Sequence, residues 1–250
     1  MKKTLLVTTL ALTSSVAMAQ TPQCKLEINN EVHLKDNVVS VYQNNQPKVV
    51  IDKSNQLFIN GDKVSLNSTQ QKAVTSYREK ISTYIPQAKE IADKGVKLAS
   101  DVIDDVSDSF NDPNAFDNLK KSVDDYYAEI QSRYYNNGEW VLKKNAVSDA
   151  MANWKSDSAT AAKRFNNEFF SSAFTALSAK MKEDGSVDLM ALQTKLSELK
   201  NNVQTKLESQ SVEIENEAKE YCGDLQGIAK DEVELRKQVP QLKDYEVFVI

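Results

Sequence analysis

The sequence has few of the residues that most enzyme active sites need. It contains one histidine, His33, two cysteines and six glycines in 250 residues. A His-rich zinc site requires more His or Cys residues than this chain can bring together, and we expect His33 to be a half-exposed strand residue rather than the base of a Ser-His-acid triad. No glycine falls in a phosphate-binding G-x-x-x-x-G-K pattern. The sequence therefore predicts no catalytic residues, no cofactor, no metal site and no enzymatic activity.

Long apolar runs and an excess of positive charge are also missing beyond the N-terminus. No segment after residue 19 approaches the roughly 18 apolar residues of a membrane-spanning helix. Two of the 31 Lys and Arg residues lie within residues 1–19, which leaves 29 basic side chains against 36 acidic ones, a net charge of −7. Nucleic acids and anionic lipids bind clustered Lys and Arg, so we expect no nucleic-acid partner and no transmembrane segment in the mature chain.

Residues 1–19 have the three parts of an export signal. Two lysines form the charged start, residues 5–16 are an apolar run, and Ala-Met-Ala at residues 17–19 is a small-residue cleavage site. We predict that the mature chain starts at Gln20 and is exported to an oxidising compartment.

The two cysteines, Cys24 and Cys222, lie near opposite ends of the predicted mature chain. In an oxidising compartment such a pair forms a structural disulfide more often than a metal site. Cys24 follows Thr-Pro-Gln rather than a small, apolar lipobox, so it is free to pair. We predict a Cys24–Cys222 disulfide, for which the chain-entropy model gives a stabilisation of at most about 5 kcal/mol.

Residues 20–66 are predicted to form a small antiparallel β module of three or four strands. Residues 38–42 and 48–51 are β-branched runs separated by a turn-rich segment. Asn60-Gly61 joins two further short strands and favours a tight hairpin, because both central residues of a type I′ turn need positive φ.

From residue 67 to residue 238 the apolar residues recur at helical spacing, which predicts an extended helical bundle. Asn67 and Gln70 resemble a capping box, and Pro86 is expected to break or kink the first helix. The fold class is therefore α+β, mostly α, with a small β module followed by about five long helices that pack on one another or on a second copy. The predicted helices cover about 67–85, 86–110, 115–135 and 146–181, and a last one runs from about 187 past Cys222.

The last of these helices has the spacing of a coiled-coil seam, with Leu192, Leu196, Leu199 and Val203 at intervals of four, three and four. The helix before it has a wider apolar arc than a two-helix seam requires. Core packing explains that arc, and the alternative is a hydrophobic groove for a lipid tail, a peptide or an unfolded client. The groove residues would be Phe165, Phe169, Phe170, Phe174, Leu177 and Met181.

Residues 239–250 form an apolar C-terminal tail that begins near Pro240. Alternation over residues 245–250 predicts an edge strand that joins the β module within the same chain. The alternative is a free C-terminal ligand for a peptide-binding domain, which captures such ends by strand addition.

Several of these segments resemble one family. Residues 49–52, 56–67 and 84–86, with Cys24 just after the signal and Cys222 late in a terminal helix, are similar to the YggN-like proteins of Gram-negative bacteria. The resemblance covers residues 24–86 and the position of Cys222, and it does not extend to the tail. It implies a periplasmic protein of unknown function and supplies no catalytic residues.

Two functions follow from these patterns. We expect a non-enzymatic envelope protein that acts through helical surfaces as an interaction or chaperone-like module, either with a protein partner or by self-association. The alternative is a carrier of a hydrophobic small molecule or lipid in a groove between helices.

Overall fold

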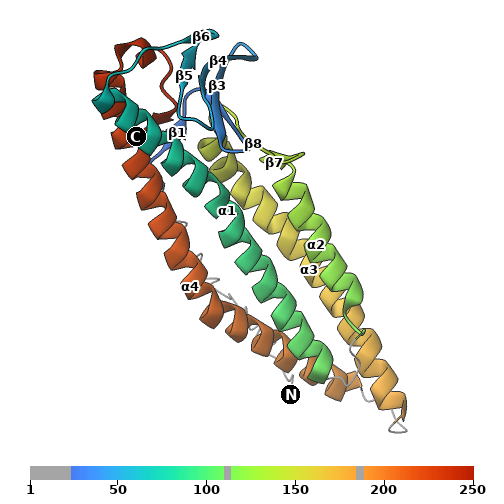
Figure 1. The fold of residues 1–250 in the computed structure, drawn as a ribbon. Helices are drawn as coiled ribbons and strands as arrows, with labels where there is room; N and C mark the ends of the chain where they lie inside the picture. The colour runs from blue at the N-terminus through green and yellow to red at the C-terminus, as the bar shows by residue number, and fades with distance from the viewer. Residues whose placement is uncertain (1–23, 110–113, 184–188) are drawn as a thin grey trace, which may run out of the picture.

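The computed structural model describes residues 24–109, 114–183 and 189–250, and the predicted signal at residues 1–19 lies outside them. Antiparallel strands gather at one end of the molecule, and four long helices run away from them (Figure 1). The predicted class, α+β and mostly α with N-terminal antiparallel strands followed by long helices, is confirmed.

Seven strands form one antiparallel sheet in the order β6-β5-β4-β3-β2-β8-β7. Its turns use asparagine and glycine in the left-handed region, including Asn44, Asn45, Asn60 and Gly61. The hairpin predicted at Asn60-Gly61 is present between β5 and β6. The strands from the β module are β2 (Glu31–Lys35), β3 (Val38–Gln43), β4 (Gln46–Ile51), β5 (Leu57–Ile59) and β6 (Asp62–Lys63).

The other two strands, β7 (Tyr135–Asn136) and β8 (Glu139–Leu142), come from the middle of the chain. The prediction that a helix continues to residue 135 was wrong, because the helix ends at Gln131 and a hairpin follows. Asn137 and Gly138 have φ values of 50° and 78°, so they are the hairpin turn rather than only a helix stop. Through this hairpin β8 pairs with β2 and extends the sheet.

The described residues contain four long helices rather than the five predicted. They are α1 (Ser68–Ser109), α2 (Asp117–Gln131), α3 (Ala146–Glu183) and α4 (Leu189–Gln238). Pro86 lies inside α1 and does not divide it. Proline removes one helical hydrogen bond, but α1 packs along α4 on both sides of this position, and this packing outweighs the local cost. At 1.5 Å per residue, α1 and α4 are about 63 and 75 Å long.

The capping box predicted at the start of α1 is confirmed. The Asn67 side-chain oxygen accepts hydrogen bonds from the backbone N–H groups of Thr69 and Gln70, at 3.0 and 2.9 Å. The Gln70 side-chain oxygen in turn accepts the N–H of Asn67 at 2.9 Å. These bonds satisfy backbone donors that the first helical turn leaves without partners.

The larger of two apolar cores lies where the sheet meets the helices. Alternate strand residues point inward, and they pack on the first turns of α1 and the last turns of α4. We call this part, residues 24–85, 135–146 and 225–250, the base. Its most deeply buried side chains include Val32, Leu57, Val74, Ile81, Ile228 and Val239.

A second, smaller core lies far from the sheet. Val102, Ile103 and Val106 of α1 meet Leu119 of α2, Phe169 and Ala173 of α3, and Val203 of α4. We call it the distal core. Leu199 and Leu207 pack against the distal core beside Val203, so this part of the predicted seam on α4 faces other helices. The side chains of Leu192 and Leu196 are not among those that the structure describes.

The C-terminal tail returns to the N-terminus. After a short 3-10 helix, η1 (Pro240–Leu242), strand β9 (Phe248–Val249) pairs antiparallel with β1 (Glu27–Ile28). This is the strand expected in the tail, although its partner is β1 in a separate two-stranded sheet. Both ends of the described chain therefore meet in the base.

Phe248 is 2 % exposed, whereas Ile250, two residues later, is 60 % exposed. We expect Phe248→Ala to lower the free energy of unfolding by about 3–5 kcal/mol, because it leaves a cavity in the base. Ile250→Ala, the control, should change it by less than about 0.5 kcal/mol. Urea unfolding followed by circular dichroism measures both, and equal effects would show that the tail does not pack into the base.

Candidate functional site

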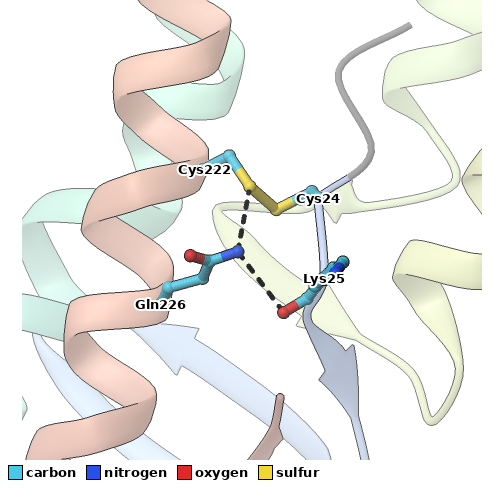
Figure 2. Close-up of a disulfide and its surroundings, with 4 residues drawn as sticks. All are labelled: Cys24, Lys25, Cys222 and Gln226. Atoms are coloured by element: carbon cyan, nitrogen blue, oxygen red, sulfur yellow. Dashed lines mark hydrogen bonds between the residues drawn. A yellow bond between two sulfur atoms is a disulfide. The ribbon is translucent and has the colours of Figure 1, made fainter.

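The predicted disulfide is confirmed. Cys24 and Cys222 are joined with a Cα–Cα distance of 5.6 Å. Figure 2 shows Gln226, one turn after Cys222 on α4, directed toward the bond. Its side-chain amide donates to the Lys25 carbonyl oxygen at 3.5 Å and lies 3.8 Å from the Cys222 sulfur. Disulfides of this kind persist in oxidising compartments.

The disulfide and the β1–β9 strand pair both fix the start of the described chain to its C-terminal part. Cys24 is three residues before β1, and Cys222 lies on the helix that leads to β9. The covalent bond therefore holds β1 beside α4, and the strand pair returns the end of the chain to β1. The two contacts close the described chain into a ring.

The aromatic residues of α3 divide into two sets. Phe165 and Phe169 stack with ring centroids 5.6 Å apart, and Phe169 lies 5.8 Å from the ring of Phe116. The space that Phe165 and Phe169 enclose with Val102 and Val203 has a free volume of about 0 Å³, too small for a water molecule. These two phenylalanines are part of the distal core.

The other residues of the predicted groove lie around the helix. Leu177 is buried and Met181 is half-buried, whereas Phe170 and Phe174 are 38 % and 52 % exposed. Phe170 meets Phe169 edge to face at 5.6 Å, so one side of its ring is already packed. Ser171 and Thr175, exposed on the same helix, carry no charge. We call Phe170, Ser171, Phe174 and Thr175 the outer α3 patch.

A buried carboxylate lies in the base. Glu232 is 3 % exposed, and its two oxygens accept the backbone N–H groups of Val247 and Phe248 at 2.6 and 2.8 Å. Burial raises the pKa of Glu232 to about 7, although both amide bonds and the nearby Arg236 act in the opposite direction. A carboxyl group with this pKa changes charge near neutral pH.

A small cavity of about 20 Å³ lies beside Glu232, with Tyr77 and Arg236 in its lining. The Tyr77 hydroxyl and the Arg236 Nε are buried without a hydrogen-bond partner among the described residues. Burial and the adjacent Glu232 raise the pKa of Tyr77 well above its ordinary value. The cavity has room for about one water molecule, which polar groups of this kind can hold.

Glu232 was not among the residues predicted from the sequence, although its position in the helix carries a signal. Glu232 occupies a position on the same helical stripe as Ile228, Leu235 and Val239, all of which are buried. An ionisable residue inside an apolar stripe is unusual, because burial of an unpaired charge is costly. The two backbone donors that offset this cost come from the tail, and helical periodicity cannot show them.

His33 is a partly buried strand residue that joins β2 to β8. Its Nδ1 lies 2.7 Å from an oxygen of Glu139, and its Nε2 lies 2.7 Å from an oxygen of Glu31. The ring stacks on Tyr42 with centroids 4.0 Å apart. The two carboxylates approach opposite sides of the ring, and no group of His, Cys, Asp and Glu in the described part of the chain is arranged to hold a metal ion.

The family model described as "Protein of unknown function (DUF2884)" matches residues 24–248. The chain belongs to this family. The matched range begins at the disulfide cysteine Cys24 and ends in β9, so it includes both contacts that close the chain. No curated protein and no solved structure matches the chain. Across the described residues, none of the helices combines the length and apolar character needed to cross a membrane.

Removing the disulfide should destabilise this DUF2884 protein measurably. We expect the double variant Cys24→Ser, Cys222→Ser to lose about 3–5 kcal/mol of unfolding free energy, because the bond closes a loop of 198 residues. Urea unfolding of the variant, and of the unaltered protein with reductant, should agree. Free thiols on both cysteines of the untreated protein would refute the pairing.

The two sets of phenylalanines should respond differently to truncation. Phe169→Ala removes a buried ring of the distal core, and we expect a loss of about 3–5 kcal/mol. Phe174→Ala removes a ring that is 52 % exposed on the same helix and should cost less than about 1 kcal/mol. Thermal unfolding of both variants tests this difference between the two phenylalanines. Equal losses of unfolding free energy would show that Phe174 belongs to the core as well.

Proposed function

We propose that this protein is a non-enzymatic protein of the periplasm that binds a protein partner through its distal helices as a chaperone-like module. The export signal predicted at residues 1–19 and the resemblance to YggN-like proteins support the periplasm. The Cys24–Cys222 bond agrees with an oxidising compartment.

The outer α3 patch is the observation that carries this proposal. Phe170 and Phe174 are one helical turn apart and expose apolar surface on a helix that packs mainly on α2. Large exposed aromatic side chains are uncommon on a surface that has no partner, and they are enriched where proteins bind one another. An apolar patch with uncharged neighbours suits an extended polypeptide that presents apolar side chains of its own.

The packing of the distal core favours surface binding over a carrier function. A pocket for a lipid or a drug-sized ligand typically encloses roughly 300–1,000 Å³. The space between Phe165, Phe169 and Val203 does not admit water. The partner therefore lies on the helices rather than between them.

A binding assay with paired variants tests this proposal. We expect the protein to suppress aggregation of a reduced, unfolded model protein, and Phe170→Ser with Phe174→Ser to abolish most of that effect. The control, Val212→Ser with Val233→Ser, removes two side chains that are 53 % and 40 % exposed on α4 and should retain it. Circular dichroism of each variant verifies folding.

Either of two results would contradict the proposal. The α3 double variant and the α4 control would suppress aggregation equally, or the unaltered protein would not suppress it at all. Organic extraction of the purified protein distinguishes the alternative, because a carrier would yield bound lipid and the proposed protein would yield none.

A further inference from the structure

The last six residues of the chain, which we call the tail segment (residues 245–250), are held by a short strand pair, by burial of Val247 and Phe248 in the base, by the ion pair of Glu246 with Arg236, and by one buried carboxyl group. Its ladder with β1 pairs Phe248 with Ile28 and Val249 with Glu27, and Asn29 donates to the Val247 carbonyl oxygen at 2.8 Å. On the side of α4, both amide contacts go to Glu232. So short a ladder is marginal in water without further contacts.

We propose that Glu232, with Tyr77 and Arg236, forms a proton-controlled docking site for the tail segment. The site holds the segment most tightly when Glu232 carries a proton, and it holds the segment less tightly, so that the segment opens more often, when Glu232 is ionised. Opening would leave residues 245–250 as a free apolar chain end and would uncover the edge of β1. This inference does not depend on the function proposed for the α3 patch.

The charges around Glu232 are too few to balance its ionised form. Within the described part of the chain, Arg236 is the only cation that faces it, and Arg236 also forms an ion pair with Glu246 of the tail segment. From α1 the site receives the uncharged Tyr77, and from the tail segment Tyr245 also lines the cavity. The side of β3 and β4 contributes only apolar side chains, namely Val39, Val41, Val49 and Ile51.

The docked state can accommodate a proton on Glu232. Each carboxyl oxygen accepts one backbone N–H and retains one further position. The Tyr77 hydroxyl, buried and without a partner among the described groups, lies at the same cavity and can accept a hydrogen bond from a protonated carboxyl. Protonation therefore removes a buried charge and keeps Tyr77 as a hydrogen-bond partner.

The direction of the pH dependence follows from burial. In the docked state the pKa of Glu232 is about 7, and its ordinary value in water is 4.5. The docked state thus binds a proton more tightly than the open state, in which Glu232 contacts water. Docking is strongest below pH 4.5 and weakens as the pH rises toward 7, above which no further change is expected.

Residue-resolved amide hydrogen exchange of the full chain by NMR tests this proposal. Protection of the Val247 and Phe248 amides, corrected for intrinsic exchange, should fall roughly tenfold or more between pH 5 and pH 8. Glu232→Gln should abolish the pH dependence. Glu234→Gln, the control, alters an exposed carboxylate paired with Lys237 on the same helix and should leave the dependence unchanged.

A second variant tests the proposal without altering Glu232. Glu246→Gln removes a negative charge near Glu232 and frees Arg236 to interact with Glu232 only. Both effects lower the pKa of Glu232, so the midpoint of the pH-dependent change in amide protection should move to lower pH. Protection that stays constant or rises with pH in the unaltered protein would overturn the proposal. An unmoved midpoint in Glu246→Gln, or an unchanged slope in Glu232→Gln, would also overturn it.

Discussion

The attachment of Cys24 and of the C-terminal tail to α4 is the constraint on which the rest of the structure depends. Cys24 is bonded to Cys222 on this helix, and β9, which follows the helix, pairs with β1 directly after Cys24. Without this junction the β module would contact the helices mainly through one face of its sheet. With it, the sheet, the start of α1 and the end of α4 share one core. The four helices are therefore anchored at one end of the molecule (Figure 1).

The two cores give the molecule unequal stability along its length. The base combines the sheet, two helices, the tail and the disulfide, whereas the distal core joins helix faces alone. Local opening free energies follow the density of buried apolar contacts, so the distal helices should open before the base does. Binding regions are commonly drawn from the less stable parts of a fold. The outer α3 patch lies in that part, which agrees with the function proposed for it.

The features that local sequence determines were predicted well. The Asn60-Gly61 hairpin and the capping box at Asn67 each depend on few residues and a known geometry. The disulfide is long-range, but it was predicted because the chain has only two cysteines to pair. The extra strand β8 was missed because Asn137-Gly138 follows a helix, and a helix stop and a hairpin turn use the same residues. The division of α1 at Pro86 was wrong because long-range packing on α4 decided the outcome.

In the candidate sites, too, the sequence predicted local features but not long-range contacts. Helical spacing identified the aromatic residues of α3 but could not separate the packed Phe169 from the exposed Phe174, because that depends on where α1 and α2 lie. Glu232 depends on a partner segment that starts 13 residues later and approaches from outside the helix. Such contacts are set by tertiary structure, and no local pattern in a single sequence encodes them.

Hydrogen exchange of proteolytic peptides from the intact, oxidised protein, measured by mass spectrometry, tests the central claim that the junction makes the base the most stable part of the molecule. We expect peptides from β2 to β5, the first turns of α1 and the last turns of α4 to exchange slowly and together. Peptides from residues 160–182 and 190–215 should exchange at least about tenfold faster. Equal protection along all four helices, or a base that exchanges before the distal helices, would contradict it.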